Sequence, residues 1–368
     1  MMPFIYVYGW HQFYIKMENC PMTEKHLTAL CNLHCAHCSH LHKTRLPPEY
    51  QTCSMDETTL KQYIRQKIDA WKTDDVHFSW QDSTSPSYSL RFFKRIINLQ
   101  QRFAQGKNII NTLLINATTL DDDWCEFFKK NDFLICISVD GDSQSCDGFS
   151  KTMFESPVTN MIETNVRLLQ KHNITFDTLT VINNINSQQP LRIYHYLKHL
   201  GSRHMRFIPF LKPLEQGGVD AQSLDPAALG TFLKTIFYTW IRLDIGTIHV
   251  PMFERAFASW CGLSVPTCVY ASYEDGESAL KINEDIYQCD RFVNLTLAEE
   301  CTRCKMEFAC HGGCTQDRIA LSRSGVPQLN YFCESYQAFF TYVEPYMLMM
   351  RALWEQNYAP SDIRQYLA

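Results

Sequence analysis

The residues best suited to chemistry in this chain are three clustered cysteines, Cys31, Cys35 and Cys38, in the run Cys-Asn-Leu-His-Cys-Ala-His-Cys. Cysteine thiolates are the usual ligands of iron–sulfur clusters, and a cubane cluster normally takes one thiolate for each of its irons. Three thiolates leave one iron without a protein ligand, and an open iron can bind a small molecule. The C-x3-C-x2-C spacing therefore predicts a cluster that activates a bound cofactor.

A structural zinc site is the alternative for the same residues, because thiolates and imidazoles also form closed tetrahedral zinc sites. Several histidines lie close by in sequence, at His34, His37, His40 and His42. Zinc cysteines usually come as a C-x2-C pair with a second pair further along the chain. The spacing of the triplet favours an iron–sulfur cluster over zinc.

The C-terminal third carries a second set of cysteines. Cys301, Cys304, Cys310 and Cys314 follow a C-x2-C-x5-C-x3-C pattern, Cys333 comes after them, and Cys268 and Cys289 precede them. These thiols are too many for one metal ion, and two further clusters fit their number better. A zinc ribbon on Cys301, Cys304, Cys310 and Cys314 is the alternative that remains open.

The elements that must position these cysteines alternate between short apolar runs and amphipathic helical patterns. This alternation predicts an α/β fold with parallel strands and crossover helices, closing into a full or partial barrel whose site lies at the carboxyl ends of the strands. We expect helices over residues 60–71 and from about Asp121, Pro190 and Pro226, with Gly201 at a helix end. The expected core strands are residues 76–80, 109–115, 133–139, 176–182 and 205–211.

The alternation fades after about residue 248, where the density of cysteines rises. We therefore expect a barrel domain over residues 1–248 and a small cysteine-rich domain over residues 249–368. The aromatic residues near the C-terminus, such as Phe339 and Phe340, are expected to pack in the core, as are Cys125 and Cys136.

Composition excludes several classes of protein. The net charge of −5 argues against a nucleic-acid surface, and no apolar run approaches the roughly twenty residues of a membrane span. The start of the chain lacks the basic segment of an export signal. Sixteen cysteines concentrated in short-spaced clusters indicate metal binding in a reducing cytoplasm rather than a disulfide scaffold.

Taken together, these motifs resemble the anaerobic sulfatase-maturating enzymes, which are radical S-adenosylmethionine (SAM) proteins with a C-terminal iron–sulfur domain of the SPASM type. The resemblance covers nearly the whole chain. It is carried by the Cys31 triplet, by Phe78-Ser79-Trp80-Gln81, by Ile137-Ser138-Val139-Asp140-Gly141, by residues 178–184, and by the closing cysteines with Asn330-Tyr331-Phe332-Cys333.

The resemblance implies a partial (β/α) barrel followed by the SPASM domain, and an oxidoreductase that converts a cysteine or serine of a sulfatase to formylglycine. The [4Fe-4S] cluster on Cys31, Cys35 and Cys38 would cleave S-adenosyl-L-methionine, and the resulting radical would take a Cβ hydrogen from the target residue. Glu254 would then accept the side-chain proton, and a ferredoxin or flavodoxin is the expected electron donor.

The resemblance also assigns ligands residue by residue. Cofactor contacts are expected at Gln81, Asn116, Ser138 and Asp140, although strand-end capping would also explain such residues. The first auxiliary cluster would use Cys268, Cys289 and Cys314, and the second would use Cys301, Cys304, Cys310 and Cys333.

Several departures from the family fall at its expected sites. Asp82-Ser83-Thr84-Ser85-Pro86 replaces Gly-Gly-Glu-Pro, Ile115-Asn116-Ala117 replaces Thr-Asn-Gly, and Glu274 stands at the spacing of a cysteine of the first auxiliary cluster. Carboxylate is a harder ligand than thiolate, and suits iron–sulfur clusters less well. These departures support an alternative function, a non-catalytic iron–sulfur paralogue that binds a peptide or a partner protein.

Overall fold

The computed structural model describes residues 25–26, 33–35, 57–71, 73–81, 90–143, 150–152, 158–214, 216–263, 279–280, 286–287 and 297–367. Contacts divide them into two compact units. The first contains the described residues up to Leu179 and the strands β9 (Ala279–Leu280) and β10 (Ile286–Tyr287), which pair with each other. The second contains the other described residues from Thr180 onward. A domain boundary at residue 248 stays a prediction.

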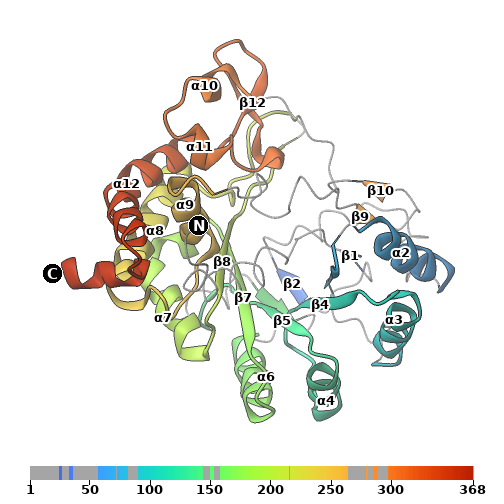
Figure 1. Cartoon of the computed structure of the whole chain (residues 1–368). Helices are drawn as coiled ribbons and strands as arrows, with labels where there is room; N and C mark the ends of the chain where they lie inside the picture. Colours follow the sequence, from blue (N-terminus) through green and yellow to red (C-terminus); the bar gives the residue numbers. More distant parts are fainter. Residues whose placement is uncertain are drawn as a thin grey trace. The chain divides into compact units, whose positions relative to one another are not determined.

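A parallel sheet is the framework of the fold (Figure 1). Within the described residues it has six strands in the order β1-β3-β4-β5-β7-β8, and β1 to β7 pair in parallel. Every expected core strand falls on one of them, which confirms the α/β fold class. The strands are β1 (Lys25–His26), β3 (Asp75–Gln81), β4 (Asn108–Ile115), β5 (Leu134–Ser138), β7 (Phe176–Ile182) and β8 (Met205–Pro209).

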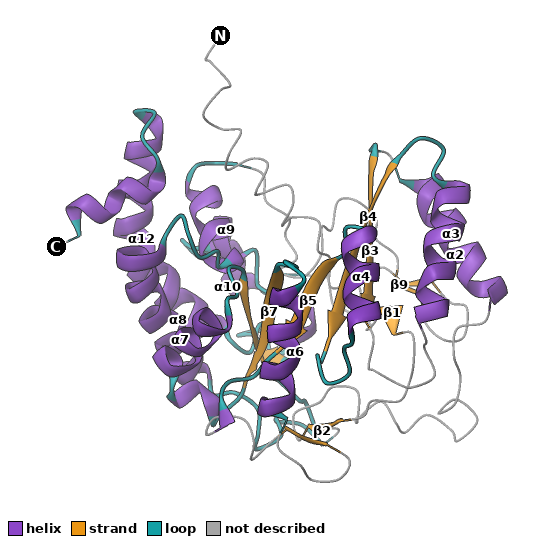
Figure 2. Ribbon diagram, turned by 90° about the horizontal axis from the view of Figure 1, so that it is seen from below, coloured by secondary structure: helices purple, strands orange, loops and turns teal. Residues whose placement is uncertain are grey.

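The helices of the first unit bury one face each. In α2 (Glu57–Ala70), Leu60, Ile64 and Ile68 recur every four residues and are fully buried, as the helical period requires. The aspartate Asp121 caps the next predicted helix, because its Oδ1 accepts a hydrogen bond of 2.9 Å from the Trp124 amide. The remaining helices are α3 (Leu90–Phe103), α4 (Asp122–Lys130) and α6 (Thr159–Lys171), of which α4 and α6 lie on the same side of the sheet (Figure 2).

The second unit is built on helices with proline in the first turn. They are α7 (Pro190–Leu200), α8 (Pro226–Thr239), which continues into the π-helical η4 (Trp240–Asp244), and α9 (Pro251–Trp260). Gly201 ends α7 with a φ of 94°, as expected of a left-handed cap. The long helix α12 (Cys333–Glu355) packs on α8 and α9 through aromatic side chains, with the Phe253 and Phe339 rings stacked at 5.5 Å.

The predicted burial of Phe339, Phe340, Cys125 and Cys136 is confirmed. Among the helices that the structure describes, none combines the length and the apolarity that a membrane span requires. The remaining elements are short: β2 (Leu33–Cys35), β6 (Ser150–Thr152), η3 (Asn186–Gln188), α10 (Glu299–Thr302), α11 (Glu307–Cys310), η6 (Thr315–Asp317), β11 (Ala320–Leu321), β12 (Pro327–Leu329) and η7 (Pro360–Tyr366).

Candidate functional site

The expected cofactor contacts come together at the carboxyl edge of the parallel sheet. Gln81 is the last residue of β3, Asn116 follows β4 directly, and Ser138 is the last residue of β5. Asp140 lies two residues beyond β5 and is only 8% exposed. Parallel strands end at the same edge, so these four positions from three adjacent strands lie along one edge of the sheet, and their contact with a cofactor stays a prediction.

The turn after β4 combines strand-end capping with backbone strain. The Asn116 side-chain oxygen accepts hydrogen bonds from the Thr118 hydroxyl at 2.8 Å and from the Thr118 amide at 3.1 Å. Ala117 has a φ of +52°, a left-handed conformation that strongly favours glycine. Its carbonyl is held by the Asn165 amide at 2.8 Å. The backbone shape that suits Thr-Asn-Gly is therefore retained here with an alanine, at some cost in strain.

Strand β1, which precedes the Cys31 triplet in sequence, ends at the same edge. Strand β1 pairs with the last two residues of β3, so that His26 lies opposite Gln81. The motif follows β1, as expected, and its centre forms β2, which pairs antiparallel with β6 and places the backbone of Cys35 opposite Ser150. That pairing was not predicted. Cys31, Cys38 and the residues 82–86 lie outside the described residues, as do the side chains of Cys35 and Gln81.

A buried polar network ties the strands below this edge to a helix. The Asn111 side-chain oxygen on β4 accepts hydrogen bonds of 2.8 Å from the Trp80 indole and from the Gln100 amide on α3. On the same strand as Trp80, His77 is 3% exposed, and neither of its ring nitrogens has a hydrogen-bond partner among the described residues. Burial lowers the pKa of His77 from its usual 6.5 to about 4, although nearby Asp75 raises it. This imidazole is neutral at pH 7.

The expected proton acceptor, Glu254, is buried in the first turn of α9. Its side chain is 6% exposed and its Oε1 lies 2.7 Å from the His249 Nδ1. The His249 ring stacks on the ring of His204, with centroids 4.7 Å apart. Glu254 is thus a buried carboxylate rather than a surface charge. The five-residue separation of His249 and Glu254 is the only sequence signal for this pair, and it is a weak one.

The cysteines expected at the second auxiliary cluster lie near one another in the second unit. Cys301 and Cys304 come from the segment around α10, Cys310 ends α11 and Cys333 begins α12. Burial raises the pKa of Cys310 to about 12 and that of Cys333 to about 11, and both also interact electrostatically with Cys301 and Cys304. Buried thiols that repel one another when charged fit a cationic iron core, which would relieve that repulsion.

The loop after Cys310 turns sharply. His311, Gly312 and Gly313 have φ values of 49°, 74° and 63°, so the chain turns through three successive left-handed residues. A Cβ at Gly312 would lie 2.4 Å from the Leu297 Cδ2, and one at Gly313 would lie 2.6 Å from the Asn330 Nδ2. A side chain at either position would have to displace Leu297 or Asn330 and would adopt a strained left-handed φ, which explains the two adjacent glycines.

A buried arginine holds the same loop. Arg318 is 8% exposed. Its guanidinium donates hydrogen bonds to the carbonyls of His311 at 3.0 Å, Gly312 at 3.3 Å and Gly313 at 3.4 Å. Its positive charge also opposes the upward shift of the Cys301 pKa, which burial causes. This arginine was not predicted, because its role depends on carbonyl groups rather than on a charged motif.

Of the ligands predicted for the first auxiliary cluster, the structure describes only Cys314. Cys314 is 5% exposed, and its carbonyl accepts a hydrogen bond of 2.9 Å from the buried Asn330 amide. Cys268, Cys289 and Glu274 lie outside the described residues. In the described ranges, no three His, Cys, Asp or Glu side chains converge as a single metal ion requires. A cubane cluster offers a separate iron to each thiolate and does not require such convergence.

Comparison with known proteins agrees with this geometry. The family model of the Radical SAM superfamily matches residues 26–197. A serine-type anaerobic sulfatase-maturating enzyme of Bacteroides thetaiotaomicron is 28% identical over 93% of this chain and 94% of its own length. A cysteine-type anaerobic sulfatase-maturating enzyme of Clostridium novyi is 24% identical over 88% of this chain and 95% of its own length.

The fold leads to the same proteins. The solved structure described as native anSMEcpe with bound AdoMet superimposes with a TM-score of 0.77 at 23% identity, over 89% of this chain and 98% of that one. These findings favour an iron–sulfur cluster over zinc for the Cys31 triplet, whereas the choice between a cluster and a zinc ribbon at Cys301, Cys304, Cys310 and Cys314 stays a prediction. Residues 26–197 carry a radical SAM domain, and over almost its whole length the chain is similar to the anaerobic sulfatase-maturating enzymes.

Proposed function

We propose that this protein is a radical SAM oxidoreductase that converts a cysteine or serine side chain of a sulfatase to formylglycine. The observation that carries the proposal is the shared strand edge, where Gln81, Asn116, Ser138 and Asp140 end or follow three adjacent strands beside β1. Support also comes from maturases that match nearly the whole chain. This full-length match disfavours the non-catalytic paralogue.

In this proposal the strand edge binds the cofactor. Backbone groups at the end of β3 and the side chains of Asn116, Ser138 and Asp140 would contact S-adenosylmethionine. When bound, the open [4Fe-4S] cluster and S-adenosylmethionine supply a radical that removes one Cβ hydrogen from the target side chain. The protein's own task is then to take the remaining proton and to carry away one electron.

Glu254 is suited to take the proton. Its carboxylate is buried and lies 2.7 Å from the His249 Nδ1, so its position is fixed by a hydrogen-bond partner. A carboxylate positioned in this way is a competent general base for a hydroxyl or thiol. For a serine target, loss of the Cβ hydrogen, the hydroxyl proton and one electron leaves an aldehyde.

The four thiols Cys301, Cys304, Cys310 and Cys333 would hold the cluster that accepts the electron, and a ferredoxin or flavodoxin would exchange electrons with the protein. We place the reaction in a reducing cytoplasm. In such a compartment the thiols stay reduced and available to iron.

The proposal is tested with protein purified and reconstituted without oxygen. Iron and sulfide are counted, dithionite and S-adenosylmethionine are added, and 5′-deoxyadenosine is measured together with the mass of a sulfatase peptide containing the target residue. We expect both 5′-deoxyadenosine and a peptide carrying the aldehyde. Clusters without either product would favour the non-catalytic paralogue, and zinc without iron would exclude both functions. Cys35→Ala is the control and should lose the iron of the open cluster.

A further inference from the structure

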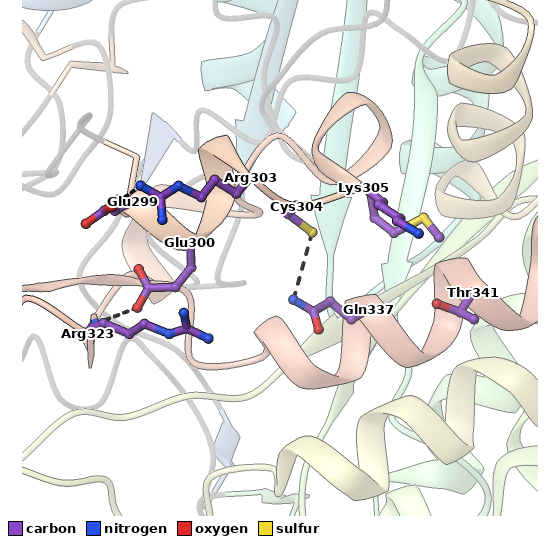
Figure 3. A pocket seen from close by; sticks show the side chains of 9 residues that line it. Glu299, Glu300, Arg303, Cys304, Lys305, Arg323, Gln337 and Thr341 are labelled. Carbon is purple, nitrogen blue, oxygen red and sulfur yellow. Dashed lines mark hydrogen bonds and ion pairs between the residues drawn. The ribbon is translucent and has the colours of Figure 1, made fainter.

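One glutamine approaches two of the thiols proposed to hold the second auxiliary cluster. Gln337 lies one helical turn after Cys333 on α12, and its Nε2 is 3.5 Å from the Cys333 Sγ and 3.9 Å from the Cys304 Sγ. Figure 3 shows the amide directed at Cys304 across a cavity of about 470 Å³. The two sulfurs belong to segments that are 29 residues apart in sequence.

Charged side chains line the same cavity. Glu299 pairs with Arg303 at 2.7 Å, the Glu300 carboxylate accepts a hydrogen bond from the Arg323 amide, and Lys305 also lines the cavity. Gln337 adds a neutral amide within reach of the two sulfurs. A primary amide has two N–H groups, so one nitrogen can donate to both sulfurs at once.

We propose that Gln337 is a positioning residue that raises the reduction potential of the cluster held by Cys301, Cys304, Cys310 and Cys333. The inference rests on the proposed function, which places a cluster at these thiols. Hydrogen bonds to the sulfurs are a known determinant of cluster potential. They stabilise the negative charge on the thiolates, and this charge is greater in the reduced cluster, so the donors favour reduction.

The size of the effect follows from the geometry. The side chain is exposed and both N···S distances are long, so the pair of bonds should stabilise the reduced state by about threefold to tenfold in its equilibrium with the oxidised state. Tenfold corresponds to about 59 mV for a one-electron couple. A shift in this range is measurable in a redox titration.

The test uses the full chain with Cys31, Cys35 and Cys38 changed to alanine, so that the open cluster does not contribute. Iron and sulfide are counted first, and the reduced clusters are then titrated by electron paramagnetic resonance under anaerobic conditions. The signal of the cluster in question is identified by its loss or alteration in Cys304→Ser. Three variants are compared with this background. Gln337→Leu removes the donors, Gln337→Glu replaces them with a negative charge, and Thr341→Val changes another residue of the same cavity.

We expect the potential to fall in Gln337→Leu, to fall further in Gln337→Glu, and to stay unchanged in Thr341→Val. Equal potentials in the background and in both Gln337 variants would overturn the role of Gln337 while leaving the cluster in place. Loss of iron from Gln337→Leu with no shift in the clusters that remain would also overturn it, because the residue would then serve only assembly. A background protein without iron would instead overturn the cluster itself.

Discussion

Replacing Glu254 with glutamine should separate the folding role of this buried carboxylate from its proposed role in proton transfer. The glutamine has the same shape, and its amide oxygen can still accept the hydrogen bond that His249 makes to Glu254 at 2.7 Å. The substitution removes only the charge and the basicity. We therefore expect a protein that folds, loads its clusters and cleaves S-adenosylmethionine, but forms little formylglycine.

The two effects differ in magnitude. Exchanging a charge-assisted hydrogen bond for a neutral one should lower the free energy of unfolding by about 1 kcal/mol. Losing a general base should slow the reaction by about 10²- to 10⁴-fold, equivalent to about 3–5 kcal/mol of activation free energy. A purely structural glutamate would show no such excess of activity loss over stability loss.

The assay follows 5′-deoxyadenosine and the aldehyde peptide in the same anaerobic reaction. Asp244→Asn is a matched control, because Asp244 is another buried carboxylate of the same unit, 4% exposed, that binds Tyr194 and Lys198. It should lower stability without uncoupling the two products. The reasoning is refuted if Glu254→Gln makes formylglycine within tenfold of the unmodified protein, or if both products fall together.

Three further predictions concern the framework. Gly313→Ala should destabilise the folded protein by about 2–4 kcal/mol, because it adds left-handed strain and displaces the Asn330 amide. Gly325 also has a left-handed φ, of +78°, but a Cβ there would meet open space, so Gly325→Ala should show only the strain of about 1–2 kcal/mol. The urea midpoints of the two cluster-loaded variants are compared. Ala117→Gly should raise the urea midpoint, because it removes about 1 kcal/mol of strain, and an unchanged or lower midpoint would show that the left-handed turn is not strained. Because the pKa of His77 is lowered from 6.5 to about 4 in the folded protein, the unfolded chain takes up a proton between these pH values that the folded chain does not. The free energy of unfolding should therefore be highest above pH 6.5 and fall by about 3 kcal/mol as the pH drops to about 4. His77→Leu should flatten this pH profile, measured by urea unfolding.

The sequence was most informative where one local rule decides the structure. Short apolar runs placed the strands and the helical period placed the helices. Asp121 marked a helix start through its capping oxygen, and Gly201 marked a helix end because glycine accepts a left-handed cap at little cost. Because parallel strands end at one edge, the shared position of Asn116, Ser138 and Asp140 also followed from the pattern.

Features that depend on tertiary contacts could not be predicted from the sequence in this way. The contact between Glu254 and His249 arises because the chain turns into α9 between them. Arg318 acts on three carbonyls, a role that leaves no trace in residue type. Gln337 is an intermediate case, since its four-residue spacing from Cys333 on a helix was readable, but its approach to Cys304 was not.

The raised pKa values of the Cys310 and Cys333 thiols determine their reactivity before the proposed cluster is inserted. Thiolates are the forms that react with oxidants and stray electrophiles, and at neutral pH Cys310 and Cys333 are almost entirely protonated. Before cluster insertion these two cysteines are therefore present as unreactive thiols. Cluster insertion must expel their protons, so loading should release acid and should be favoured as the pH rises.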